Sequence, residues 1–115
     1  LSGNIGEWSE IYTFFKLLAD GKLHAANADL TLDPTSYYPI VKITRQQKDF
    51  SFEYVLDETS ISISKNAGIA PVRTIARKDF ANAAKNLLSA IGVAQATFSV
   101  PTVDETLELS DITSL

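Results

Sequence analysis

The sequence of 115 residues contains no cysteine, no methionine and a single histidine, His24. Without cysteine it cannot form disulfides, thiolate zinc sites or a cysteine nucleophile. A Ser/His/Asp triad or a multi-histidine metal site would have to take all its imidazole from His24, so we expect neither. These absences exclude several common catalytic and metal-binding arrangements and agree with a cytoplasmic location.

Long apolar runs are missing as well. The segment 67–72 is broken by glycine and proline, and nothing approaches the roughly 20 apolar residues that cross a bilayer, so a membrane span is excluded. No secretory signal pattern opens the chain. Because the sequence starts at Leu1 and contains no methionine, we expect a processed or excised piece of a longer protein.

Positive charge is also in short supply. Fourteen acidic residues against ten basic ones give a net charge of -4. A negative net charge does not favour nucleic-acid binding through overall electrostatic attraction. Any contact with DNA must therefore be local. With 45% apolar and 21% charged residues, the composition is typical of a folded globular protein, and the length predicts a single domain over residues 1–115.

Two long helices are predicted. Asn4 and Glu7 have the spacing of a capping box, which predicts a helix over Ile5–Asp20 that Gly21 ends. Asp79 is a candidate cap for a second helix, which we expect to end at Gly92. Its apolar positions recur with helical spacing: Phe80, Ala83, Ala84, Leu87, Leu88 and Ile91.

Alternating apolar and polar residues predict three strands over 37–45, 49–56 and 59–65. The connections are too short for helical crossovers, so we expect an antiparallel meander. Residues 22–26 read as a short extended piece before a loop over 27–36, and a second capping box at 102–105 predicts a short helix to Leu109. The predicted fold class is α+β, with a three-stranded meander packed against two main helices and a short C-terminal helix.

Glu7 and Glu10 lie outside the narrow polar strip of the first predicted helix. A carboxylate among apolar neighbours must be paired, hydrogen-bonded or bound to a cation. Glu7 either completes the capping box with Asn4 or contributes to a metal site. Glu10 either forms a salt bridge with a lysine or arginine or contributes to a metal site. Hard oxygen ligands of this kind suit Mg²⁺.

Candidate DNA contacts lie in a turn between two predicted strands and at the end of the third. Arginine and glutamine can read base edges in the major groove, whereas isolated positive charges contact phosphates; an ordinary solvated loop is the alternative. The candidates at the turn are Arg45, Gln46, Gln47 and Lys48. Lys65, Asn66, Arg73, Arg77 and Lys78 are expected to be phosphate contacts or plain surface.

Several segments, taken in order, resemble one family. Residues 6–12, 16–23, 25–30 and 38–43 look like the amino-terminal opening of HpaII-type restriction endonucleases, and 98–101 and 112–115 also fit. The resemblance implies a type II restriction enzyme of the PD-(D/E)XK class that cleaves duplex DNA with Mg²⁺, at CCGG in the namesake. It also implies that an early helical glutamate adds to the metal site, which Glu7 and Glu10 could do as catalytic residues, with Glu10 as metal ligand.

The sequence departs from that class in one respect. No strand carries an acidic residue followed by an (E/D)-x-K strand, so we expect the catalytic acid and lysine to lie after Leu115 and this piece alone to be inactive. It would supply scaffold and DNA contacts. The alternative is a non-enzymatic interaction or dimerisation domain, and a homodimer is compatible with both interpretations.

Overall fold

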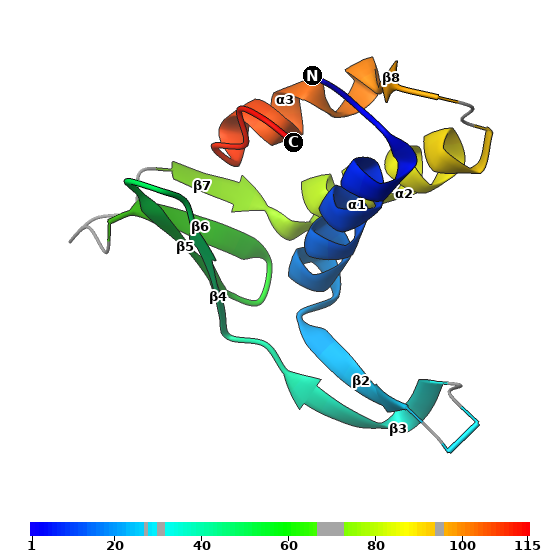
Figure 1. The fold of residues 1–115 in the computed structure, drawn as a ribbon. Helices are drawn as coiled ribbons and strands as arrows, with labels where there is room; N and C mark the ends of the chain where they lie inside the picture. Colours follow the sequence, from blue (N-terminus) through cyan, green and yellow to red (C-terminus); the bar gives the residue numbers. More distant parts are fainter. Residues whose placement is uncertain (27, 30–31, 67–72, 94–95) are drawn as a thin grey trace.

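The computed structural model describes residues 1–26, 28–29, 32–66, 73–93 and 96–115. It is an α+β fold in which helices α1 and α2 lie side by side and cover one face of a four-stranded sheet (Figure 1). The elements run in the order β1 Ser2–Gly3, α1 Ile5–Asp20, β2 Lys22–Ala26, β3 Leu32–Pro39, β4 Lys42–Gln46, β5 Ser51–Leu56, β6 Ser60–Lys65, β7 Arg73–Ala76, α2 Arg77–Val93, β8 Phe98–Ser99, a 3₁₀ turn Pro101–Val103 and α3 Asp104–Leu109.

Helix α1 has the predicted bounds. At its start the capping box is complete in both directions, since the Asn4 side chain accepts from the Glu7 N–H and the Glu7 side chain accepts from the Asn4 N–H. At its end Gly21 adopts a left-handed conformation (φ 69°), and its N–H donates to the carbonyl of Leu17. Glycine takes this conformation without steric strain, so both ends of α1 are determined by local sequence.

The sheet is a meander of four strands rather than the three expected, in the order β4-β5-β6-β7, all antiparallel. The strand missed was β7. It is four residues long and has one buried apolar side chain, Ile75, so its alternation is too short to stand out in the sequence. The predicted strands over 49–56 and 59–65 are found as β5 and β6.

The predicted strand over 37–45 is two strands. Pro39 cannot donate a ladder hydrogen bond, and the N–H of the next residue, Ile40, bonds to Gly21 instead. The chain therefore leaves β3, which pairs with β2, and enters β4, which pairs with β5. The predicted loop over 27–36 is wrong for 32–36, which belong to β3; residues 27, 30 and 31 lie outside the described part.

Helix α2 begins at Arg77 and continues to Val93, so Asp79 lies in its first turn instead of capping it and Gly92 does not end it. The second capping box is also wrong. Pro101 starts a 3₁₀ turn there, and α3 begins at Asp104 without a side-chain cap, although it ends at Leu109 as expected. Among the helices of the described residues, none has the length and apolar character needed to cross a membrane.

The core lies between the helices and the sheet. Its completely buried aromatic residues come from α1, α2 and β5, and the C-terminal elements close one end. Phe15 meets Phe80 edge-on at 5.2 Å between ring centroids, and Phe14 meets Tyr54 at 4.9 Å. The largest of these buried side chains are Trp8, Phe15, Tyr54 and Phe80.

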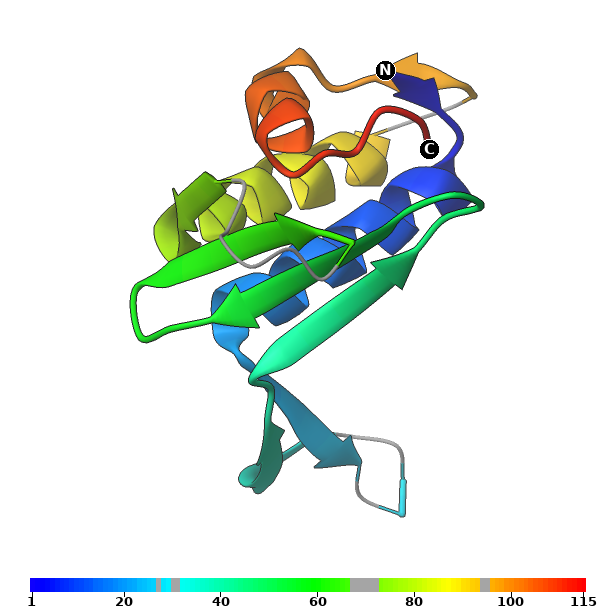
Figure 2. The same ribbon diagram turned by 90° about the vertical axis from the view of Figure 1, so that its left-hand side faces the viewer.

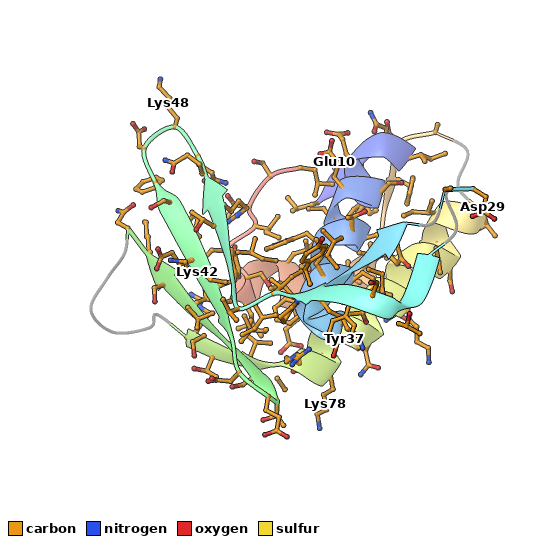
Figure 3. All side chains as sticks on the ribbon, turned by 90° about the horizontal axis from the view of Figure 1, so that it is seen from below. Glu10, Asp29, Tyr37, Lys42, Lys48 and Lys78 are labelled. Carbon is orange, nitrogen blue, oxygen red and sulfur yellow. The ribbon has the colours of Figure 1, made fainter. Side chains whose placement is uncertain are left out.

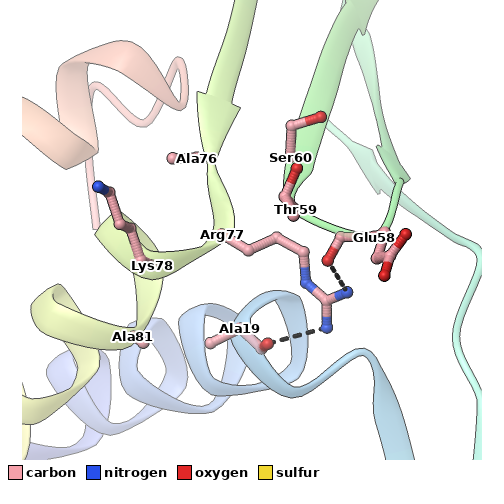
Figure 4. Close-up of a pocket in the computed structure, with 8 residues that line it drawn as sticks. All are labelled: Ala19, Glu58, Thr59, Ser60, Ala76, Arg77, Lys78 and Ala81. Atoms are coloured by element: carbon pink, nitrogen blue, oxygen red, sulfur yellow. Dashed lines mark hydrogen bonds between the residues drawn. The ribbon is translucent and has the colours of Figure 1, made fainter.

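Arg77 connects the two layers (Figure 4). One guanidinium nitrogen donates to the Ala19 carbonyl in the last turn of α1 at 2.9 Å. The other donates to the carbonyls of Asp57 and Glu58, in the connection between β5 and β6, at 3.1 Å each. A Cβ added at Gly21 would collide with this guanidinium, so a larger residue there would force Arg77 to shift away from these hydrogen bonds.

Replacing Arg77 by alanine should lower the free energy of unfolding by about 2–3 kcal/mol, because three hydrogen bonds from a charged group to backbone carbonyls are lost together. Urea denaturation measures this directly. The matched control is Lys78→Ala at the exposed neighbouring residue, which should change stability by less than about 0.5 kcal/mol. Equal midpoints for the two variants would contradict this role of Arg77.

Candidate functional site

Glu7 is held by the start of its own helix. Its Oε1 accepts the N–H of Asn4 at 3.0 Å, and its own N–H donates to Asn4 Oδ1 at 2.9 Å. The side chain is half-buried. The capping alternative for Glu7 is thus present in the structure, and one carboxylate oxygen, Oε2, is not used by this cap.

Glu10 is exposed, so the expectation that its carboxylate avoids water is wrong. It has no ion-pair partner within the described ranges, and the predicted salt bridge is therefore not found there. The reason is visible in its apolar neighbours. Ile11 and Phe14 pack against the core but are only partly buried, because this face of α1 also borders an open cleft.

The two glutamates line that cleft together. It has a volume of about 360 Å³ and lies between α1, β4 and the C-terminal segment. Because residues three apart on a helix are neighbours, the two carboxylates share one rim. The other lining residues are Ile11, Phe14, Ile43, Thr44, Arg45, Ile112, Ser114 and Leu115.

Arg45 supplies the positive charge of this cleft. It belongs to β4 and not to the turn, and its guanidinium lies 4.7 Å from the ring centroid of Phe52. Its Nη2 donates to the carbonyl of Asp111 at 2.6 Å, while its Nε is buried with no hydrogen-bond partner in the described part of the chain. Burial raises the pKa of the adjacent Tyr54 phenol, although Arg45 acts in the opposite direction. Arg45 therefore points inward, away from the hairpin tip.

The turn between β4 and β5 begins two residues later than expected and comprises residues 47–50. The Nε2 of Gln46 donates to the carbonyls of Gln47 and Phe50, at 3.2 and 3.4 Å. Gln47 is half-buried and its N–H donates to Phe50. Lys48 extends from the tip of the hairpin into solvent (Figure 3).

Lys65 and Asn66 lie beside this hairpin although they come at least 15 residues later in the chain. Asn66 and Ser51 exchange two hydrogen bonds: the Asn66 N–H donates to the Ser51 carbonyl at 2.7 Å, and the Ser51 N–H donates to Asn66 Oδ1 at 3.0 Å. The Lys65 ammonium lies 3.9 Å from the ring centroid of Phe50. Five of the candidate DNA contacts therefore form one surface, which we name the sheet-end patch: Gln46, Gln47, Lys48, Lys65 and Asn66.

The sheet-end patch and the start of α1 lie at the same end of the molecule (Figure 2). Seen from below, Lys48 and Glu10 also project toward the same side (Figure 3). Cationic and amide side chains thus lie on the sheet side of this end, and two carboxylates lie on the helix side. A charged polymer could contact both sides at once.

Two other predicted phosphate contacts have structural partners. The Arg73 guanidinium donates to the Glu108 carbonyl at 3.1 Å and pairs with Asp111 at 3.7 Å, and Arg77 makes the bonds described above. Arg77 and the exposed Lys78 line a cavity of about 720 Å³ at the far end of α1, which the sequence did not predict (Figure 4). The Arg77 guanidinium in this cavity is thus already hydrogen-bonded to backbone carbonyls.

The chain was compared with known proteins. Residues 4–115 match the family model described as HpaII restriction endonuclease. The chain belongs to this HpaII family. It is 37% identical over 116 residues to the type II restriction enzyme HpaII of Haemophilus parainfluenzae, in an alignment that covers 99% of this chain. The predicted resemblance is thereby confirmed.

The HpaII family match concerns one part of a longer relative. The chain spans about a third of the length of that enzyme, since the alignment covers 32% of it. No solved structure matches the chain. The roles of individual residues in this HpaII-type chain must therefore be inferred from the geometry of the chain itself.

If the sheet-end patch of this HpaII-type chain binds duplex DNA, Lys48→Ala and Lys65→Ala should each weaken that binding at low salt. If each lysine neutralises one phosphate, each variant should also reduce the slope of log K against log salt by about 0.9. Gel-shift titrations across salt concentrations measure both quantities. Lys85→Ala, an exposed lysine on α2, is the control and should leave the slope unchanged. Equal behaviour of all three variants would argue against the sheet-end patch.

Proposed function

We propose that this chain is the amino-terminal part of a type II restriction endonuclease that cleaves duplex DNA at a short specific site with Mg²⁺. CCGG is the site that the resemblance to the namesake suggests. The chain would supply scaffold, DNA contacts and one or two carboxylates. The observation that supports this best is the placement of Glu7 and Glu10 at the same end of the molecule as the sheet-end patch.

The carboxylates suit a metal that is shared with DNA. The described residues contain no group of three or more His, Cys, Asp or Glu side chains that could hold a metal ion. Mg²⁺ is commonly bound by one or two carboxylates together with waters and substrate phosphate oxygens, so a pair of glutamates fits. Glu10 is the better ligand because it is exposed and not engaged in a cap.

Each side of the site then has a definite task. When bound, Mg²⁺ lowers the pKa of a water and balances the charge on the attacked phosphate. Glu10 would hold it, and Glu7 would add its second oxygen while fixing the start of α1. Lys48 and Lys65 would bind phosphates, and the amides of Gln46, Gln47 and Asn66 could contact base edges or phosphates. Arg45, which points inward, would keep β4 aligned with the cleft.

The remaining catalytic groups would come from sequence that follows these 115 residues in the full-length enzyme. This accounts for the missing (E/D)-x-K strand and for the coverage of only 32% of the relative. We propose accordingly that the 115-residue piece alone does not cleave DNA, and that the complete enzyme acts in the cytoplasm, where its substrate is found.

Glu10→Gln in the full-length endonuclease should lower cleavage by about 10–100-fold, a range typical for groups that support a metal site. Glu7→Gln should lower it less, since glutamine at this position still completes a capping box and keeps the fold. Single-turnover cleavage over a range of Mg²⁺ concentrations measures both, and the Glu10 variant should need more Mg²⁺.

Glu108→Gln provides the control, because Glu108 is an exposed glutamate on α3 and does not line the cleft. It should cleave like the unmodified enzyme. If all three glutamine variants cleave normally at limiting Mg²⁺, the glutamates have no part in the metal site.

A further inference from the structure

Strand β4 forms one edge of the four-stranded sheet (Figure 2). Its ladder with β5 is continuous from the pair of Lys42 with Val55 to the pair of Gln46 with Ser51, and it contains no bulge. Within the part of the chain that the structure describes, no strand pairs with the other side of β4. Such an edge presents backbone N–H and C=O groups to any extended segment, and neither a proline nor a bulge prevents pairing here.

Two hydrogen bonds at the ends of this ladder show which residues of β4 face β5. The N–H of Leu56 donates to the Val41 carbonyl at 2.9 Å, and the N–H of Gln47 donates to the Phe50 carbonyl at 2.7 Å. In an antiparallel pair, residues that bond across the ladder alternate with residues whose N–H and C=O point away. The odd-numbered residues of β4 therefore bond to β5, and the even-numbered ones face outward. These outward-facing residues are Lys42, Thr44 and Gln46.

The cleft between α1 and β4 reaches this edge, since Thr44 is one of its lining residues. Its other walls include apolar side chains that are only partly buried, namely Ile11, Phe14 and Ile43. Val41, directly before β4, is 71% exposed. A strand added at the edge places every second side chain on the helix side of the sheet, so apolar residues at alternate positions would fill the cleft. One segment would thus satisfy the backbone of β4 and cover the apolar walls.

We propose that a strand from the part of the full-length enzyme that follows these 115 residues adds to the edge of β4 and fills the cleft. The inference rests on the proposed function, in which the chain is the amino-terminal part of a longer endonuclease. The alignment covers only 32% of the relative, so about two thirds of such an enzyme lies outside the structure. The partner of this edge is an extended segment of the same polypeptide with apolar residues at alternate positions.

The position of Leu115 suits such a strand. Leu115 lines the cleft, and its side chain lies against the start of α1, where a Cβ added at Gly3 would collide with it. Strand β4 runs toward this same end of the molecule (Figure 2). A segment that enters from Leu115 and passes along β4 is therefore antiparallel to it, and antiparallel strands need only a short connection. The segment also brings the following part of the enzyme to the rim that carries Glu7 and Glu10, where the proposed function needs further catalytic groups.

Amide hydrogen exchange, compared between the full-length enzyme and the 115-residue chain, tests the proposal. The N–H groups of Thr44 and Gln46 should exchange at least about tenfold more slowly in the full-length enzyme, because only there do they find acceptors. Those of Ile43 and Arg45 bond to β5 in both proteins and are the internal control. The proposal is overturned if Thr44 and Gln46 exchange equally fast in both proteins, or if their protection disappears on dilution because a second copy supplies it.

Proline substitution tests the edge itself. Thr44→Pro removes an outward-facing N–H and leaves the bonds to β5 in place, so the 115-residue chain should unfold at nearly the same urea concentration. In the full-length enzyme the same change should abolish the slow exchange at Gln46. It should also let a protease cut the connection after Leu115 at least about fivefold faster, since the added strand is released. Slow exchange at Gln46 that persists in this variant would overturn the proposal.

The opposite edge of the sheet offers a matched control, Thr74→Pro. Thr74 is an exposed threonine on β7, the other edge strand. The N–H of Arg77 donates to the Thr59 carbonyl, so the same alternation makes the N–H of Thr74 face outward. This variant should leave the exchange at Gln46 and the rate of proteolysis after Leu115 unchanged in the full-length enzyme. Equal effects of the two proline variants would contradict a strand added specifically at β4.

DNA cleavage by the full-length enzyme, measured in parallel, separates this inference from the proposed function. An enzyme that cleaves DNA while its Thr44 amide exchanges freely overturns the added strand and leaves the nuclease function intact. A protein that protects the Thr44 amide but does not cleave DNA has the added strand and lacks the proposed function.

Discussion

The structure depends on arginine side chains that satisfy backbone carbonyls at the ends of other elements. The last carbonyls of a helix lack partners within it, and neither α1 nor α3 has a basic residue in its own last turn. Arg77 reaches Ala19 at the end of α1, Arg73 donates to the last turn of α3, and Arg45 donates to Asp111 just beyond it. Each bond joins residues far apart in sequence, so together they hold the helical layer on the sheet.

This use of arginine determines where charge remains for binding. All three arginines donate to backbone carbonyls, so the cations facing solvent at the sheet end are lysines, Lys48 and Lys65. Because Arg45 connects β4 to the segment after α3, it also keeps one wall of the cleft beside Glu7 and Glu10. The same interaction that stabilises the fold therefore sets the position of the carboxylates relative to the sheet-end patch.

Local signals predicted much of this architecture. Helix α1 has both a capping box and a terminal glycine, and β5 and β6 alternate clearly, so their bounds follow from neighbouring residues. The extended piece predicted over 22–26 is β2, but its pairing with β3 could not be predicted, because β3 forms only by pairing with β2 across a loop. Strand β7 is too short to show a pattern. The same holds for the site. Glu7 and Glu10 were found from helical spacing, but only the register of β5 with β6 brings Lys65 to the hairpin, and only packing reveals that Arg45 points inward.

The central claim is that the end of the molecule shared by the sheet-end patch and the start of α1 faces DNA. Nuclear magnetic resonance of the isotope-labelled 115-residue chain, titrated with duplex DNA at low salt, tests this claim most directly. The account predicts amide shift changes at residues 46–48 and 65–66, extending to 7–10 when Mg²⁺ is added. Changes confined to α2 or to strands β2 and β3, with the sheet end unaffected, would contradict it.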